Sequence, residues 1–342
     1  METPVRQLNK CFLLYASCVP VKGYARSIIA DLQREQYLPV PNLLADILIQ
    51  NRGISTEEIK ARYDHAYDTG IDTWFRELEK AEWGFFTEEP ECFPPLSMDW
   101  DHPSAITQAI LDMDKKENYE IDAIIGELDA LGCKALQIRV FGNITAQQAG
   151  KWAAAAAETG IFSMEMILPA SVFRDMQEAE AFVAEYCRLV SLVLYGANED
   201  QPYIAAHPAA REVIYLTSTV LTPESVEKTG PEFFITNIHA FTEAQHHNLG
   251  LNRKIAIDTQ GLIRHFPGHK RSFGKAGITS LNEIVADAAF QQVWNISADQ
   301  IETCRDCEFR YLCPDNSEIE AKDGKYVRLT TCGYDPYSGT WQ

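Results

Sequence analysis

The sequence predicts an α/β protein with three parts: an N-terminal winged-helix-like domain, a partial, open TIM-like barrel, and a C-terminal cysteine-rich metal-binding domain. Strand-like apolar runs precede helical patterns in the first 90 residues, strands and helices then alternate, and four of the nine cysteines gather near the C-terminus. The expected boundaries are 1–90 for the first domain, 91–103 for a linker, 104–250 for the barrel and 251–342 for the metal domain.

The composition narrows the class of partner. A net charge of −19, from 30 basic and 49 acidic residues, repels nucleic acid and anionic lipid at long range. With 46% hydrophobic residues the chain can bury sizeable cores, yet no apolar run approaches the roughly 20 residues of a membrane-spanning helix. The N-terminus lacks the basic and apolar stretches of a secretory signal. These features predict a cytoplasmic protein without nucleic-acid or membrane partners.

The first 90 residues predict short strands followed by helices. The apolar runs that indicate strands are 12–15, 27–30 and 37–40. Three helices are then expected, starting near Leu43, at the capping box Ser55–Glu58, and near Ile71. Strands followed by three helices are typical of a winged-helix-like module.

Such a module can bind DNA, but the acidic character of this chain argues against that use. It can instead accept an extended peptide as an additional strand at an exposed sheet edge. Candidate peptide-binding residues lie on the last predicted strand and the third helix: Tyr37, Leu38, Val40, Trp74, Phe75 and Leu78. The apolar stripe of the third helix also fits a plain hydrophobic core, with only part of it beside the peptide.

From residue 104 the pattern alternates. Strands are expected at 135–140, 162–168, 191–195, 212–216 and 233–238, with helices near 117–132, 145–159 and 171–189. Helices between strands imply right-handed crossovers and a parallel sheet. Four or five strands are too few for the eight of a closed barrel, so the barrel is expected to be open. A hairpin over 253–263 and a helix near 280–294 follow.

The C-terminal cysteines form the strongest chemical signal. They are Cys304, Cys307, Cys313 and Cys332. Four thiolates in this arrangement suit a tetrahedral zinc ion or an iron–sulfur cluster, and the spacing does not choose between them. An odd number of cysteines without an export signal argues against a disulfide framework. The other five cysteines stand among apolar neighbours and are expected to be buried thiols.

Five of the eight histidines lie between His239 and His269. A second metal site or a general base is conceivable there, but ordinary surface or hydrogen-bonded histidines are the preferred interpretation. No phosphate-binding loop or dinucleotide fingerprint is present. No catalytic residue is indicated.

The pattern Cys304-x2-Cys307-x5-Cys313, with the closing run Cys332-Gly-Tyr-Asp-Pro-Tyr-Ser-Gly-Thr-Trp341, resembles a SPASM domain. Such domains are cluster-binding extensions of radical SAM peptide-modifying enzymes. The segments 252–261, 18–23 and 26–33 add a resemblance to the SPASM-domain peptide maturases of grasp-with-spasm systems. The resemblance implies partnership with an ATP-grasp ligase and a ribosomal precursor peptide, and it implies that the four cysteines hold the outer cluster.

Two departures from that family bear on function. The chain lacks the Cys-x3-Cys-x2-Cys spacing that holds the SAM-cleaving cluster, so no SAM is expected. By resemblance, the cysteines of a second, inner cluster would fall near Phe266 and the pair Asn316–Ser317, which carry no thiol. One four-cysteine site is therefore expected to remain, holding either a 4Fe–4S cluster or Zn²⁺.

Two functions follow as hypotheses. The first is maturation of a ribosomally synthesised, post-translationally modified peptide, in which this chain binds the leader of the precursor as an accessory protein beside the ligase. The alternative is a redox-active peptide-modifying enzyme that uses one auxiliary 4Fe–4S cluster. A DNA-binding winged helix is disfavoured by the net charge of −19.

Overall fold

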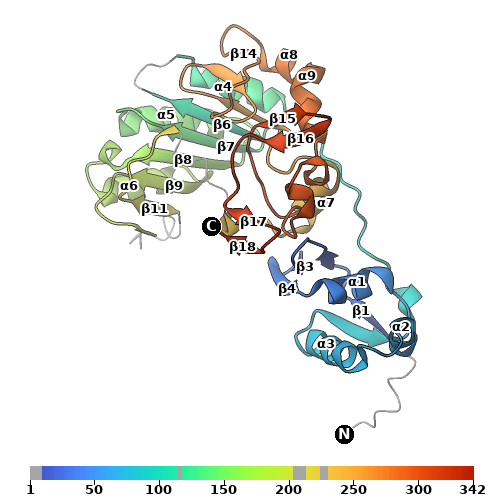
Figure 1. Cartoon of the computed structure of the whole chain (residues 1–342). Coiled ribbons are helices and arrows are strands. Elements are labelled where there is room, and N and C mark those ends of the chain that lie inside the picture. Colours follow the sequence, from blue (N-terminus) through green and yellow to red (C-terminus); the bar gives the residue numbers. More distant parts are fainter. Residues whose placement is uncertain (1–9, 115–117, 203–212, 224–229) are drawn as a thin grey trace.

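The computed structural model describes the chain except for residues 1–9, 115–117, 203–212 and 224–229. The first nine residues of the predicted N-terminal domain and the first residue of the predicted strand 212–216 therefore lie outside the described residues. Figure 1 shows the N-terminal part at one end, the large sheet at the other, and the C-terminal segment between them.

The N-terminal part contains the predicted strands and helices and two further strands. In chain order the elements are β1 (Cys11–Leu14), β2 (Cys18–Val21), β3 (Ser27–Asp31), β4 (Gln36–Val40), α1 (Asn42–Gln50), α2 (Thr56–Arg62), α3 (Asp68–Lys80) and β5 (Gly84–Thr87). β2, β3 and β4 form one antiparallel sheet in that order, and β1 pairs with β5. β2 has no recognisable strand pattern in the sequence because Pro20 interrupts it, and proline is tolerated there since β2 is an edge strand.

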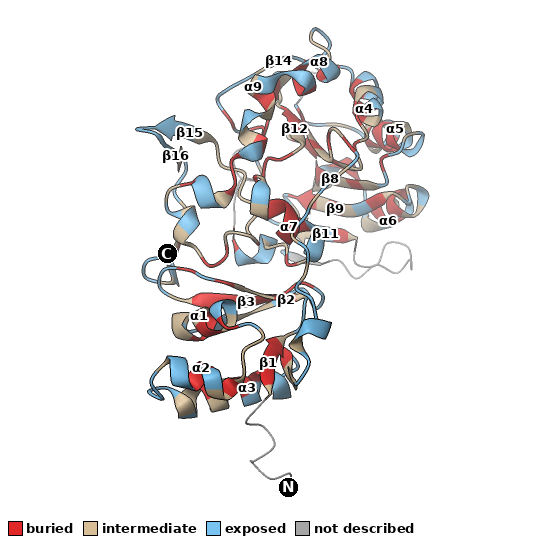
Figure 2. Cartoon of the chain, turned by 90° about the vertical axis from the view of Figure 1, so that its right-hand side faces the viewer, coloured by how far each residue is buried: buried red, intermediate tan, exposed pale blue. Residues whose placement is uncertain are grey.

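The N-terminal helices pack on the β2–β3–β4 sheet around a core of their own. Ile29, Leu44, Ile59 and Phe75 are among its buried members. The Ser55 hydroxyl accepts the backbone N–H of Glu58 at 3.3 Å, as the capping pattern predicts. β3 is buried along its whole length (Figure 2), so both faces of this small sheet are covered.

The large sheet has nine strands. Six central strands run parallel, in the order β12 (Lys254–Ile257), β6 (Gln108–Met113), β7 (Ala135–Val140), β8 (Ser163–Pro169), β9 (Leu189–Tyr195) and β11 (Ile214–Thr217). Short antiparallel strands extend the two edges: β10 (Gln201–Pro202) beside β11, and β13 (Leu262–Arg264) with β14 (Gly274–Lys275) beside β12. Within the described residues β10 and β14 do not pair, so the sheet is open, as expected for a partial barrel.

Three crossover helices pack against one face of this sheet: α4 (Ile121–Ala130), α5 (Ala146–Ala157) and α6 (Met176–Glu185). Alternate residues of the strands, such as Leu111, Ile138 and Met166, join their apolar side chains in one core. The next residues along the strands face the other way and include polar pairs. Asp112 receives two 2.6 Å hydrogen bonds from Arg139, and both side chains are fully buried.

One predicted strand is wrong. Residues 233–238 do not form a strand; the chain there forms the 3₁₀ turn η6 (Pro231–Phe233), and α7 (Ile238–His246) begins at its end. Asn237 caps α7 by accepting the backbone N–H of Ala240 at 2.9 Å. The run of apolar residues reflects packing rather than β-structure, because Ile235 and Phe234 contact the C-terminal segment.

The C-terminal part consists of short elements. The helix expected near 280–294 is divided at Asp287 into α8 (Leu281–Ala286) and α9 (Ala288–Gln291), because the Asp287 side chain caps the second of them. Two hairpins follow, β15 (Ile319–Lys322) with β16 (Lys325–Arg328), and β17 (Tyr334–Asp335) with β18 (Thr340–Trp341).

The remaining 3₁₀ turns of the described residues are η2 (Pro90–Cys92), η3 (Ala170–Val172), η7 (Gln292–Asn295), η8 (Ala298–Gln300) and η9 (Cys304–Asp306).

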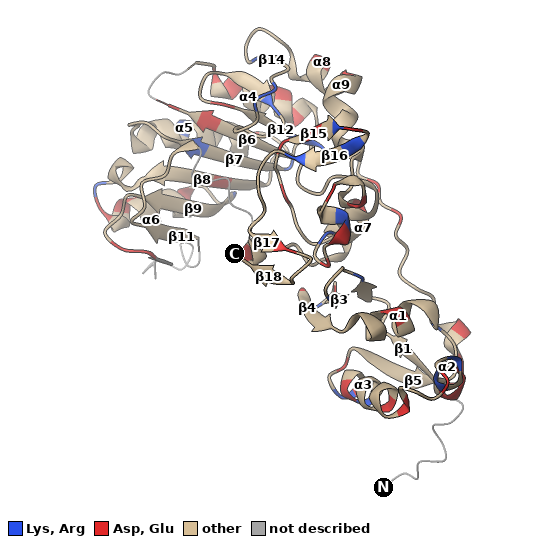
Figure 3. Cartoon of the chain, in the orientation of Figure 1, with Lys and Arg blue, Asp and Glu red and all other residues tan. Residues whose placement is uncertain are grey.

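Acidic residues are spread over the N-terminal helices, the crossover helices and the C-terminal segment (Figure 3). Among the described residues, no helix has the length and apolar character needed to cross a membrane.

Candidate metal centre

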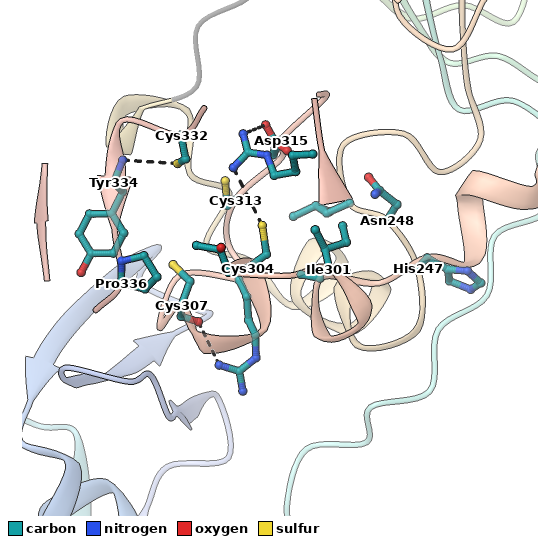
Figure 4. Close-up of a pocket in the computed structure, with 15 residues that line it drawn as sticks. His247, Asn248, Ile301, Cys304, Cys307, Cys313, Asp315, Cys332, Tyr334 and Pro336 are labelled. Carbon is teal, nitrogen blue, oxygen red and sulfur yellow. Dashed lines mark hydrogen bonds and ion pairs between the residues drawn. The ribbon is translucent and has the colours of Figure 1, made fainter. Parts of the chain in front are cut away.

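The four C-terminal cysteines line one cavity between the short C-terminal elements (Figure 4). Cys304 opens η9, Cys307 follows it, Cys313 lies on the next loop, and Cys332 precedes β17. All nine cysteines of the chain are free thiols in the structure. The tertiary fold therefore brings together the four residues predicted as one site, including Cys332 from nineteen residues downstream.

The backbone around the cysteines directs polar hydrogens at sulfur. The N–H of Phe309 donates to Cys307 Sγ at 3.4 Å, and the N–H of Tyr334 donates to Cys332 Sγ at 3.4 Å. Both donors lie two residues after their acceptor. Donors of this kind stabilise a thiolate more than a thiol, so they suit metal-bound sulfur.

Arg328 brings a positive charge to the same cavity. Its Nη1 lies 4.0 Å from Cys304 Sγ, and its Nη2 pairs with Asp315 at 2.6 Å. The guanidinium reaches the cysteines from the end of β16. Its positive charge acts to lower the pKa of Cys304, whereas burial raises that pKa, because a nearby cation favours the thiolate.

Burial dominates the titration of Cys304, Cys307 and Cys313. It raises the pKa of Cys304 to about 11 and that of Cys307 to about 12, and it raises the pKa of Cys313 well above its ordinary value. Without a metal these three groups are neutral thiols at neutral pH. Metal binding must displace their protons, so the affinity for metal rises with pH.

The cavity differs from a preformed site for one ion. Among the described residues, no three His, Cys, Asp or Glu side chains converge closely enough to hold a metal ion. The cavity measures about 60 Å³, whereas a single water needs only roughly 10–15 Å³. Four cysteines that line one cavity are a donor set that suits a tetrahedral zinc ion or a 4Fe–4S cluster.

The backbone before Cys304 is strained. Thr303 has a φ of +70°, a conformation that β-branched residues rarely adopt. Such strain persists only where surrounding contacts impose it, and it gathers at functional sites.

The predicted peptide-binding residues divide into three groups. Val40, Phe75 and Leu78 are buried in the N-terminal core, so they can only form the floor of a site. Leu38 and Trp74 are half-buried and pack on that core from outside. Tyr37 is half-buried and faces the C-terminal segment instead, with its ring centroid 5.2 Å from that of Phe309.

The histidines do not form a second metal site within the described residues. Two of them hold backbone carbonyls: His265 Nε2 lies 2.7 Å from the Phe290 oxygen, and His269 Nε2 lies 2.7 Å from the Asn316 oxygen. The ordinary hydrogen-bonded interpretation therefore fits both. The hydrogen bond of His269 also brings the loop after Phe266 close to Asn316. These are the two places where the resemblance would put cysteines of an inner cluster and where this chain has none.

Sequence reasoning missed Arg328, Asp315 and Glu308. Arg328 and Asp315 line the cavity, and Glu308 is fully buried beside Cys307. Charged residues in an acidic chain carry no local sign of burial, so their role could be recognised only from the fold.

No family model matches the chain, and no curated protein matches it. Similar solved structures include three of SuiB from Streptococcus suis, each with 10% sequence identity. SuiB alone covers 88% of this chain and 94% of its own, with a TM-score of 0.38. SuiB bound to S-adenosylmethionine and SuiB bound to the precursor peptide SuiA each cover 89% and 95%, with TM-scores of 0.29 and 0.28. These TM-scores do not establish a shared fold.

Proposed function

We propose that this chain is a peptide-maturation protein that binds the leader of a ribosomally synthesised precursor peptide at its N-terminal sheet. The observation that carries the proposal is the edge of β4. In the described part of the chain, β4 pairs only with β3, while each face of the sheet packs against a hydrophobic cluster. A peptide can therefore extend this sheet through its backbone, and the protein needs no further groove for it.

The side chains around β4 suit an extended peptide. Gln36 and Pro39 on the strand are exposed, and Leu38 and Trp74 offer the unburied parts of their apolar surfaces. Backbone hydrogen bonds to β4 would provide affinity, and these apolar side chains would select alternate residues of the peptide.

The four cysteines hold a 4Fe–4S cluster in this proposal, with Zn²⁺ as the alternative. The four cysteines that line one cavity support a metal group of either kind. When bound, such a group supplies a redox-active centre and a four-point link between the cysteine loops. Arg328 balances the negative charge of the thiolates, and the N–H groups of Phe309 and Tyr334 hold two of them in place.

The remaining roles follow from the resemblance to grasp-with-spasm maturases. The open sheet cradles the modified part of the precursor, an ATP-grasp ligase acts on it, and the proteins work in the cytoplasm. The chain itself does not cleave SAM, since it lacks the Cys-x3-Cys-x2-Cys pattern. Co-expression with an ATP-grasp ligase from the same genome, followed by co-purification, tests this partnership.

Peptide binding is tested by titrating the full chain with fluorescent synthetic peptides that match each short reading frame found in the neighbourhood of its gene. We expect saturable binding, and we expect Trp74→Leu to weaken it about tenfold, as loss of an aromatic contact does. Phe162→Ser is the matched control, because Phe162 is 66% exposed and lies just before β8, far from β4 in sequence and outside the N-terminal core. Absence of binding by the full chain would refute the proposal.

The metal is tested by elemental analysis and absorption of anaerobically purified protein. We expect about four irons per chain if a 4Fe–4S cluster is bound, and their loss in Cys304→Ser or Cys313→Ser. Cys187→Ser is the control, since Cys187 is an exposed thiol outside the cavity. Stoichiometric zinc without iron would remove the redox centre and with it the alternative function of a redox enzyme.

A further inference from the structure

The β2–β3–β4 sheet is the place where the N-terminal part meets the cysteine loops. The helices cover one face of this sheet. The other face packs against Phe309, Leu312 and Tyr334, with Cys307 and Cys332 at the margin of the same cluster. Residues next to the candidate metal ligands therefore support the sheet that carries the β4 edge.

The loop between β2 and β3 adds backbone hydrogen bonds to these loops. The N–H of Tyr24 donates to the carbonyl of Asp306 at 2.8 Å, and the N–H of Ala25 donates to the carbonyl of Pro336 at 3.2 Å. Asp306 directly precedes Cys307. The position of the β2–β3 loop thus depends on the position of the cysteine loops.

An ion pair between the partly exposed Arg26 and the buried Glu308 strengthens this connection. Arg26 Nε lies 2.7 Å from Glu308 Oε1, and the hydroxyl of Tyr334 donates to the same oxygen. The Glu308 side chain is fully buried, and its second oxygen has no hydrogen-bond partner. A buried carboxylate that loses its cation is strongly destabilising, so Glu308 holds Arg26, and with it the start of β3, against the cysteine loop.

β4 contacts a ligand-bearing loop through aromatic rings. The ring of Tyr37 meets that of Phe309 edge-on, with 5.2 Å between centroids. The backbone N–H of Phe309 donates to Cys307 Sγ. A single residue therefore touches β4 with its ring and a candidate ligand with its backbone.

The cysteine loops have little regular structure of their own. In the fully described stretch between η8 and β15, η9 is the single helix or strand element. A metal that joins four cysteines contributes folding free energy to such a segment. Its loss leaves the loops with fewer constraints, and the contacts to Arg26 and Tyr37 loosen with them.

We propose that metal loading at the four cysteines organises the β2–β3–β4 sheet and raises the affinity of the β4 edge for its peptide, with Arg26 and Tyr37 as positioning residues. This inference rests on the proposed function of peptide binding. Because the coupling is a free energy shared by two sites, bound peptide also retains the metal more tightly.

Amide hydrogen exchange of the full chain tests the coupling without any peptide. Protein reconstituted with iron and sulfide is compared with protein stripped by a chelator. We expect β4 and the β2–β3 loop to exchange about tenfold faster in the stripped protein, while β7 and β8 of the large sheet serve as the internal control. Equal exchange of β4 in the two forms would overturn the proposal.

Variants separate coupling from simple loss of metal. In the loaded protein, Arg26→Gln should move the exchange of β4 toward that of the stripped protein while the iron content stays the same. Arg26→Lys keeps the cation and should restore much of the protection. Arg174→Gln is the matched control, because the Arg174 side chain is 84% exposed and pairs with Glu178 outside the N-terminal part. Full protection of β4 in Arg26→Gln would contradict the role of Arg26.

Peptide titration then distinguishes this inference from the proposed function. Loaded protein should bind the synthetic precursor about tenfold more tightly than stripped protein. Equal affinity in both forms would overturn the coupling and leave strand addition intact. Absence of binding in both forms would refute the peptide function, while the exchange experiment would still decide whether metal organises the sheet.

Discussion

At the scale of single residues, burial of polar groups is the dominant feature of this protein. Glu308 and the pair Asp112–Arg139 have no side-chain exposure. Each of these charges lies beside an opposite charge, because an unpaired charge in a protein interior costs several kcal/mol. Arg139 still has one nitrogen, Nη1, without a hydrogen-bond partner.

His265 makes stability depend on pH. Burial lowers its pKa to about 4 from an ordinary 6.5, although the hydrogen bond with the Phe290 carbonyl opposes the shift. The folded state therefore binds the proton of His265 less readily than the unfolded state does. The contribution of His265 to the free energy of unfolding is complete above pH 6.5 and declines as pH falls toward 4. We expect a loss of about 2 kcal/mol between pH 7.5 and 4.5 from this residue.

Urea denaturation at the two pH values checks this expectation. His265→Gln keeps an N–H donor for Phe290 and should show a correspondingly smaller loss on acidification. His65→Gln is the control, since the side chain of His65 is 60% exposed. An identical pH dependence of wild type and His265→Gln would contradict the prediction.

At the scale of elements, caps decide where helices begin in the C-terminal half. Asn237 starts α7 and Asp287 starts α9, each by accepting a backbone N–H. α7 carries Phe241, which is 1% exposed and packs with Tyr311 near the cysteine loops. The cap of α7 therefore influences the surroundings of the metal site as well as the helix.

We expect Asn237→Ala to lower the free energy of unfolding by about 1 kcal/mol, because the Ala240 N–H loses its partner. Asn237→Asp retains a side-chain acceptor and should behave like the wild type. Denaturant unfolding gives the energies, and hydrogen exchange in the first turn of α7 locates the effect. Equal stability of all three proteins would mean that the cap contributes nothing.

At the scale of the whole molecule, the N-terminal part and the cysteine loops approach each other at Gly23. A Cβ at this position would lie 2.8 Å from the backbone N of Glu308 and would also clash with the carbonyl of Arg26. Both obstacles are backbone, so neither can move without displacing its element. The close approach of the two parts requires glycine here.

We expect Gly23→Ala to loosen this contact and to speed tryptic cleavage at Lys22 and Arg26 about tenfold, since local opening exposes cleavage sites. Gly126→Ala is the matched control: Gly126 lies within α4 and a Cβ there meets nothing within 4 Å. That change should be neutral or slightly stabilising. Similar cleavage of both variants would show that the approach at Gly23 tolerates a side chain.

Much of the local structure was predictable. The alternation around 135–140 and 162–168 indicated β7 and β8, and the alanine-rich run indicated α5, because side-chain period directly reflects strand or helix. The run 233–238 gave a wrong strand prediction because its apolar residues do not follow the period of a strand. They face the C-terminal segment from an irregular turn and a helix start. A short apolar run alone does not separate these cases.

The sequence by itself predicted many of the strands and helices, the four cysteines as one set, and the absence of the SAM-cluster spacing, because these depend on residue type and distance along the chain. Only the tertiary structure decided that β1 pairs with β5, that the sheet remains open within the described residues, and that Arg26 and Tyr37 meet the cysteine loops. Those contacts join residues up to 308 positions apart, and no local pattern encodes them because they depend on how separate elements pack.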